Sequence, residues 1–347
     1  MIAVIGGTGH LGNVLIRELL KRGEKVICIV PKGEDLTPLN GLDVEVRFSD
    51  ITDFESINKM LFGVDYVYHT AGIVSIIKGE WEKLYKVNVL GARNVVEACI
   101  KNKVKRLVYT SSIHAFKEPP NQVPITEGTP LDPEYGEYAK SKALATIEVL
   151  KGVENGLNAV IVAPTGIIGP YDFKISEMGT LILKYIKSKV FFYVDGAYDF
   201  VDVRDVAIGE ILAMERGKTG QIYILSGEKI TVKEILNTLR SISGKKIPHI
   251  KIPYSFAKFT ALLTPIISRI THEKPLFTLY SLSVLKSNCN VQKDKATREL
   301  GYSSRPLQKS LKDAYMWFKE NYRGNKPLRN FHRMYCSNFK RKINFSS

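Results

Sequence analysis

The stretch Ala3-Val4-Ile5-Gly6-Gly7-Thr8-Gly9-His10-Leu11-Gly12 lies at the start of this 347-residue chain and predicts the fold. Its first three residues are typical of a short buried strand. An apolar-periodic helix follows through Val14 and Leu19 and ends at Gly23. The glycines between them form a G-x-x-G-x-x-G turn. Such a turn adopts unusual backbone angles and lets a pyrophosphate approach main-chain N–H groups at the positive end of a helix.

A second apolar strand, Lys25 to Val30, follows where a strand–helix–strand unit requires it. Strands and helices then alternate to about residue 170, after which the pattern loosens. We therefore expect an α/β chain with a Rossmann-type doubly wound parallel sheet and a smaller, interleaved C-terminal substrate region. The expected division is a dinucleotide-binding domain over 1–170, with parts of 195–228 returning to it. A substrate-binding region over 171–322 and a basic tail over 323–347 complete it.

Tyr138 and Lys142 are four residues apart, so a helix places them on one face. A free tyrosine has a pKa near ~10, and a fixed ammonium beside the phenol favours its ionised form. The pair therefore predicts a phenol that can shuttle a proton at neutral pH. Lys140 falls on a different face and is expected to be an ordinary surface lysine.

Ser111 and Ser112 end a predicted strand that begins at Val104. In a parallel sheet, ligands gather at the carboxyl ends of the strands, so these hydroxyls should face the same crevice. A serine at a strand end also serves as a turn former or helix cap, which is the competing interpretation.

With these residues in place, the chain resembles the extended short-chain dehydrogenase/reductase family over roughly residues 1–322. The matching landmarks, in their expected order, are the glycine turn, Asp50 to Asp53, His69 to Gly72, Asn88 to Val95, Tyr109 to Ser112, Tyr138 to Lys142 and Pro164 to Pro170. Within the family, Phe200 to Ala207 is similar to the branch of dihydroflavonol reductases, cinnamoyl-CoA reductases and 3β-hydroxysteroid dehydrogenases.

The resemblance implies an NAD(P)-dependent oxidoreductase that moves a hydride between nicotinamide and a ketone, aldehyde or hydroxyl substrate. Tyr138 would be the general acid or base, Lys142 would lower the phenol pKa and hold the ribose, and Ser112 would bind the substrate oxygen. Asn88 would hold a relay water, with a buried structural amide as the alternative. The residues that it assigns to the cofactor are Gly6, Gly9, His10, Leu11, Gly12, Lys32, Asp50, Ile51, Thr70, Ala71, Gly72, Tyr138, Lys142, Pro164, Thr165 and Ile167.

Cofactor preference depends on the residues after the second strand, where NAD enzymes place an acid and NADP enzymes a base. This chain reads Val30-Pro31-Lys32-Gly33, with Glu34 and Asp35 only later. We expect Lys32 to meet a 2′-phosphate and so expect NADP rather than NAD.

Two other functions stay open from the sequence. A nucleotide-sugar epimerase or dehydratase would use the same tyrosine and lysine, but such relatives commonly carry Arg-x-x-Asn before the Gly-Pro pair. This chain has Val162 to Pro170 without that motif. The second alternative is a non-catalytic, nucleotide-sensing protein. Such proteins tend to lose the catalytic residues, whereas this chain keeps Ser112, Tyr138 and Lys142.

Composition adds limits on compartment and partners. The four cysteines show no metal-like spacing, so we expect no metal, and a reduced, cytoplasmic setting fits better than a disulfide framework. The net charge is +15, of which seven basic residues and no acid lie in 323–347. We expect this tail to be flexible rather than to bind nucleic acid or membrane. The helix predicted over 253–263 is expected to pack on the domain rather than to lie in a membrane interface. The family resemblance further suggests a homodimer through the helices that carry Asn88 and Tyr138.

Overall fold

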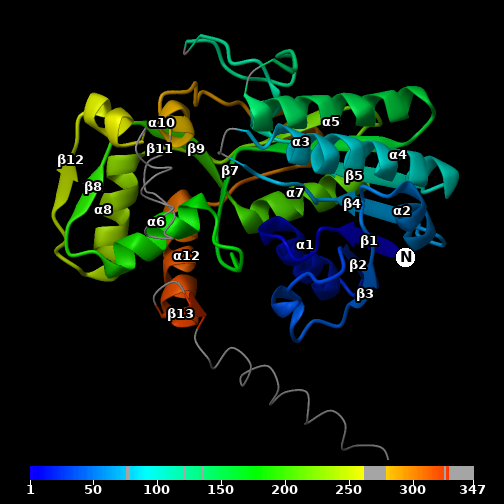
Figure 1. Ribbon diagram of the computed structural model, residues 1–347, viewed down its shortest axis with the longest axis horizontal. Helices are drawn as coiled ribbons and strands as arrows, with labels where there is room; N and C mark the ends of the chain where they lie inside the picture. Colours follow the sequence, from blue (N-terminus) through cyan, green and yellow to red (C-terminus); the bar gives the residue numbers. More distant parts are fainter. Residues whose placement is uncertain (76–78, 121, 135, 262–278, 324–325, 328–347) are drawn as a thin grey trace, which may run out of the picture.

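The computed structural model describes residues 1–75, 79–120, 122–134, 136–261, 279–323 and 326–327. Its largest sheet has seven strands, all parallel, in the order β10-β6-β5-β4-β1-β2-β3 (Figure 1). These strands are β1 (Ile2–Ile5), β2 (Val26–Val30), β3 (Glu45–Phe48), β4 (Tyr66–His69), β5 (Arg106–Thr110), β6 (Ala159–Pro164) and β10 (Ile222–Leu225). The predicted Rossmann-type fold is therefore confirmed.

Alternate residues of each strand face opposite layers of helices, because side chains along a strand point to the two faces in turn. Val4 of β1 packs on the layer of α1 (His10–Lys21) and α7 (Val203–Arg216). Ala3 and Ile5 pack on the other layer. That layer contains α2 (Phe54–Met60), α4 (Gly91–Lys101) and α5 (Glu137–Glu154). Burial on both faces explains why the strands read as continuous apolar runs.

The strand order reverses around β1, whose neighbours are β2 on one side and β4 on the other. At such a switch point the connections leave in opposite directions and open a crevice beyond the carboxyl ends of the strands. The glycine turn, Thr70 and Ser112 follow β1, β4 and β5 directly, so all three lie at this edge.

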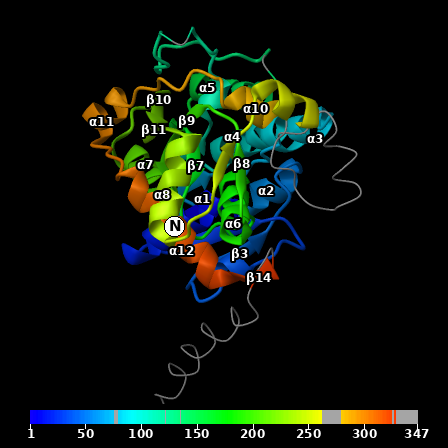
Figure 2. The same ribbon diagram turned by 90° about the vertical axis from the view of Figure 1, so that its left-hand side faces the viewer.

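A second group of elements lies at the other end of the molecule (Figures 1 and 2). Three strands form a sheet in the order β11-β9-β7. They are β7 (Gly166–Ile168), β9 (Ala197–Asp202) and β11 (Glu228–Thr231). Their inner residues share a core with α6 (Glu177–Lys187), α8 (Val232–Ser243) and α12 (Leu307–Asn321). The expected domain division stays a prediction, although β10 does return to the large sheet beside β6.

The other described elements are short. They are α3 (Trp81–Leu84), a π-helical segment (Tyr85–Leu90), β8 (Phe191–Tyr193), β12 (His249–Lys251), α10 (Leu279–Val284), α11 (Asp294–Leu300), β13 (Tyr322–Arg323), β14 (Lys326–Pro327) and two 3-10 turns (Thr37–Leu39 and Ile113–Ala115).

The helix predicted over 253–263 is described over 254–261, and one of its faces is packed as expected: Ala257 and Ala261 are buried. Residues 262–263 and most of the 323–347 tail lie outside the described residues. Among the helices that the structure describes, none combines the length and the apolar character needed to cross a bilayer. The homodimer and the cytoplasmic location stay predictions.

Candidate functional site

The glycine turn is closed by contacts that only glycines allow. Gly6 has a φ of +89°, and a Cβ on it would lie 2.7 Å from the Ala71 backbone. A Cβ on Gly12 would lie 2.3 Å from the Gly6 carbonyl oxygen. Gly9 precedes α1 and, having no side chain, leaves the first turn of the helix without a side-chain cap. The turn therefore presents a bare helix N-terminus of the kind that binds a pyrophosphate, and its residues fit a dinucleotide.

Two other residues of the turn have side chains engaged elsewhere. His10 Nε2 lies 3.0 Å from the Pro170 carbonyl oxygen, which ties the turn to the end of β7. Leu11 is buried in the core between the sheet and α7. Contacts from these two residues to a cofactor would therefore come from their backbone.

A carboxylate, that of Glu34, lies beside the glycine turn, whereas the sequence predicted that a basic residue, Lys32, would meet the cofactor there. Glu34 accepts a hydrogen bond from Thr8 Oγ1 at 3.0 Å and pairs with Lys174 at 2.6 Å. Lys32 is exposed after the end of β2. The sequence alone gave Glu34 no role because it lies four residues past the strand, and only the fold of that loop brings it back to the turn.

Asp50 and Ile51 follow β3. Asp50 is exposed and accepts from the Thr52 backbone N–H, while Asp53, not Asp50, caps α2. Ile51 is buried against Gly91 at the start of α4. Asp50 is thus the more open of the two residues assigned to the adenine.

The segment after β4 is fixed by hydrogen bonds to β1 and to Asn88. Thr70 Oγ1 donates to the Ile5 carbonyl oxygen at 3.0 Å. Asn88 accepts from the Ile73 N–H at 2.8 Å, and its amide donates to the Ile73 carbonyl oxygen and to Ser141 Oγ. Asn88 lies in the π-helical segment and is buried. Its side-chain oxygen and nitrogen both have protein partners, which favours the structural amide among the two interpretations.

Ser112 and Tyr138 meet at the carboxyl end of β5. Ser112 follows the strand and caps the 3-10 turn by accepting from the His114 N–H at 3.2 Å. Burial raises the pKa of the Tyr138 phenol, and the nearby Ser112 hydroxyl lowers it by less, so the net shift is upward. The structure therefore brings together the two hydroxyls that the sequence pairs.

Lys142 is placed differently from the sequence expectation. Its ammonium donates to the Thr110 carbonyl oxygen at 2.6 Å and to the Tyr109 hydroxyl at 3.2 Å. The phenol that it contacts is thus Tyr109 rather than Tyr138. Burial lowers the pKa of Lys142 to about 7. The helix spacing does place Lys142 one turn from Tyr138, but the upward pKa shift of Tyr138 is opposite to the one that the pair predicts.

Two buried titratable groups beside Lys142 were missed by sequence reasoning. Glu210 of α7 accepts from Thr110 Oγ1 at 2.5 Å, and its other oxygen has no partner among the described residues. Burial raises the pKa of Glu210 to about 7. Burial and the charge of Lys142 lower the pKa of His69 to about 3. No sequence signal pointed to Glu210, because it lies on a helix far along the chain from Tyr138.

The end of β6 contributes to the same edge. Pro164 is its last residue, and Thr165 Oγ1 donates to Asp199 Oδ1 at 2.6 Å. Ile167 lies in β7, opposite Val201 of β9. The Thr165 hydroxyl is thus directed at Asp199, and its contact with a cofactor stays a prediction.

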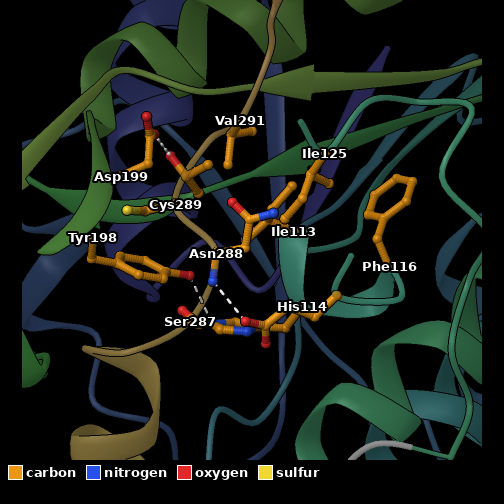
Figure 3. Close-up of a pocket in the computed structure, with 12 residues that line it drawn as sticks. Ile113, His114, Phe116, Ile125, Tyr198, Asp199, Ser287, Asn288, Cys289 and Val291 are labelled. Carbon is orange, nitrogen blue, oxygen red and sulfur yellow. Dashed lines mark hydrogen bonds between the residues drawn. The ribbon is translucent and has the colours of Figure 1, made fainter. Parts of the chain in front are cut away.

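A pocket opens next to this edge (Figure 3). His114 forms one wall; its Nε2 lies 2.9 Å from the Tyr198 hydroxyl, and its ring lies 6.1 Å from the Tyr138 ring. Burial lowers the pKa of His114 to about 4, so the ring is neutral at physiological pH. The other lining residues are Ile113, Phe116, Glu118, Ile125, Thr165, Asp199, Ser287, Asn288, Cys289 and Val291. Neither lysine nor arginine is among the described residues that line this pocket.

The parallel sheet and the glycine turn are those of a dinucleotide-binding α/β protein. A family model, NAD dependent epimerase/dehydratase family, matches residues 2–226. The chain belongs to this family, which confirms the resemblance found in the sequence.

Similar proteins extend the likeness over nearly the whole chain. "Sterol demethylase protein B" of Methylococcus capsulatus is 36% identical over 321 residues, which cover 91% of this chain and 98% of that protein. A protein of Synechocystis named after dihydroflavonol 4-reductase is 31% identical over 324 residues, covering 92% and 94%. The crystal structure of gox2253 has a TM-score of 0.80 and 33% identity, covering 92% and 98%.

Proposed function

We propose that the chain is an NAD(P)-dependent oxidoreductase in which Tyr138 and Ser112 act on the carbonyl or hydroxyl group of a small, apolar substrate. The observation that carries the proposal is the proximity of the Ser112 and Tyr138 side chains at the carboxyl edge of the sheet, where the Ser112 hydroxyl lowers the pKa of the phenol against the raising by burial. When bound, the nicotinamide would supply or accept the hydride. Ser112 would orient the substrate oxygen, and Tyr138 would give or take its proton.

Lys142 has an indirect part in this proposal. Its ammonium fixes the Thr110 carbonyl and the Tyr109 hydroxyl, so it holds the end of β5 that carries Ser112. A Cβ on Gly72 would lie 3.9 Å from Lys142 Nζ, so the ammonium also borders the segment after β4. Lys142 is thus in position to hold the ribose of a cofactor that lies over Gly72.

The pocket supports a reductase over a nucleotide-sugar epimerase. A diphosphate is normally bound by arginine or lysine. The charged groups among the described lining residues are instead acidic, Glu118 and Asp199, and four apolar side chains accompany them. An uncharged, apolar substrate therefore fits this lining better, and a sterol-related name among the similar proteins is consistent with it.

We also infer that the preferred cofactor is NAD, against our sequence expectation of NADP. Glu34 lies against Thr8 of the glycine turn, where its carboxylate can accept from ribose hydroxyls, as the acid of NAD enzymes does. Lys32, which suggested NADP, is exposed.

The proposal is tested by supplying NADH or NADPH with sterol-like ketones, aldehydes and nucleotide sugars, while the nicotinamide absorbance is followed. We expect net oxidation of the cofactor with an apolar ketone. In that reaction, Tyr138→Phe should keep cofactor binding and lose ~10²–10⁴-fold in turnover. Tyr66→Phe is the control, because Tyr66 begins β4 at the opposite edge of the sheet.

Two results would overturn the proposal. Turnover of Tyr138→Phe within a few-fold of the parent would remove Tyr138 from its role. Conversion of a nucleotide sugar without net change in absorbance would instead favour the epimerase.

A further inference from the structure

The edge formed by β8 and β12 exposes apolar side chains. Phe192 and Ile250 lie opposite each other in this two-stranded parallel sheet. They are 47% and 43% exposed, whereas Phe191 and Tyr193 on the other face of β8 are buried. Because strand residues alternate between faces, the pair directs two large apolar groups at solvent.

The helix at 254–261, which follows β12, also exposes apolar side chains. Ala257 and Ala261 are buried on its inner face, while Phe256 and Phe259 are 55% and 61% exposed. Residues three apart share one face of a helix, so the two phenylalanines lie together. The helix follows β12, which lies at the end of the molecule away from β1 (Figure 1). The Ile252 N–H donates to the Tyr193 carbonyl oxygen at 2.9 Å and so fixes the connection between them to β8.

The segments that carry these apolar groups also contain exposed lysines. The segments 187–195 and 245–261 together contain six lysines, all exposed: Lys187, Lys189, Lys245, Lys246, Lys251 and Lys258. Their one carboxylate is Asp195, which pairs with Lys251. The two segments therefore have a formal net charge of +5.

We propose that this face binds the surface of an anionic lipid bilayer. We call it the docking face and define it by Phe192, Ile250, Phe256, Phe259 and the six lysines. Phenylalanine that enters the interface beside lysines that meet anionic head groups is the pattern of proteins that lie on a membrane. A protein partner fits less well, because lysine is depleted in protein–protein interfaces.

The docking face is separate from the proposed active site but is connected to its pocket. The Leu285 carbonyl oxygen accepts from the Ala197 N–H at 3.2 Å, and Leu285 packs in the cluster that buries Ala257. Ser287 and Asn288, two and three residues further, line the pocket. The segment 285–288 therefore contacts both the cluster beneath the docking face and the pocket.

The test is co-sedimentation of the full chain with vesicles of phosphatidylcholine and phosphatidylserine, compared with phosphatidylcholine alone. We expect binding to the mixed vesicles only, and we expect 1 M salt to weaken it by screening the lysines. The double variant Phe256→Ser, Phe259→Ser should lower the partition coefficient about ten-fold or more, because each phenylalanine loses its buried area. Phe62→Ser is the matched control, since Phe62 is 80% exposed at the end of α2 and should change nothing.

The basic tail is the rival source of vesicle binding, so a second variant carries Lys340→Gln, Arg341→Gln and Lys342→Gln. Binding that this variant loses and the double phenylalanine variant keeps would overturn the proposal, as would equal binding to neutral vesicles. Quenching of NADH fluorescence, measured on every variant, should stay at the parent value. Failure of the docking proposal would thus leave the proposed enzyme untouched, and failure of the enzyme would leave vesicle binding unchanged.

Discussion

Lys142 and Glu210 contact the same residue, Thr110, from opposite layers of the sheet. The ammonium binds the Thr110 carbonyl oxygen at 2.6 Å, and the carboxyl accepts from Thr110 Oγ1 at 2.5 Å. Both groups are buried, and the charge of Glu210 raises the pKa of Lys142 against the lowering by burial. Glu210 therefore helps Lys142 to keep its proton near neutral pH.

Glu210→Gln should shift the alkaline side of the pH–activity profile to lower pH. The amide keeps the contact with Thr110 but removes the negative charge that supports the ammonium, so Lys142 should lose its proton at a lower pH. The measurement is kcat/KM with the substrate found in the panel, from pH 5 to pH 10. Glu215→Gln, on the exposed side of the same helix, is the control. An unchanged profile would show that Glu210 does not act on Lys142.

Lys142→Met should abolish activity, and its melting temperature relative to the parent should be most favourable at pH 6 and least favourable at pH 10. The pKa of Lys142 is depressed from 10.5 to about 7, so the folded chain gains stability as pH rises from 7 to 10.5 and lacks that stability below 7. Removing the buried charge should therefore help most at low pH, and the advantage should shrink toward pH 10. Thermal melts of the variant and of Lys140→Met, at several pH values, make the comparison. A constant difference across pH would contradict the assigned shift.

Glu34→Gln should bring the dissociation constants of NADH and NADPH closer together. In the parent we expect NADH to bind more tightly than NADPH, because the carboxylate accepts from the ribose hydroxyls, although its ion pair with Lys174 offsets part of its repulsion of a 2′-phosphate. Fluorescence titration measures both constants. Lys32→Ala should leave the ratio of the two dissociation constants unchanged. Tighter binding of NADPH than of NADH by the parent would instead support the NADP preference expected from the sequence.

Asn88→Ala should lower the free energy of unfolding by ~1–3 kcal/mol, because the Ile73 backbone and Ser141 lose a buried partner. Urea denaturation checks this value. Unchanged stability with reduced turnover would instead favour the proton-relay role.

The fold could be predicted from the sequence because its signals are local. The Gly6–Gly12 turn and the apolar strands are each encoded within a few consecutive residues, and the expected strand positions agree with β1, β2 and β5. The second structural group was described only in outline, since its strands are short and join partners far apart in the chain, such as β7 and β9.

The candidate site was predictable only in part. Spacing placed Tyr138 and Lys142 on one helix, but the partner of the ammonium depended on β5, where Tyr109 and the Thr110 carbonyl lie closer. Likewise, the positions of Glu34 and Glu210 at the site could not be predicted from the sequence, because neither residue belongs to a recognisable motif. Both reach the site only through the packing of loops and helices.

The position of β10 in the large sheet limits where the chain can be cut into shorter fragments. β10 pairs with the side of β6 that no other strand covers. It follows β7, α6, β8, β9 and α7 in the chain and is therefore synthesised after them. A fragment that stops at residue 170 would expose the unpaired backbone of β6 along one border, and such borders invite self-association. We would therefore expect that fragment to aggregate in the cell, and a longer fragment that extends past Leu225 to be the shortest candidate for an isolated nucleotide-binding unit.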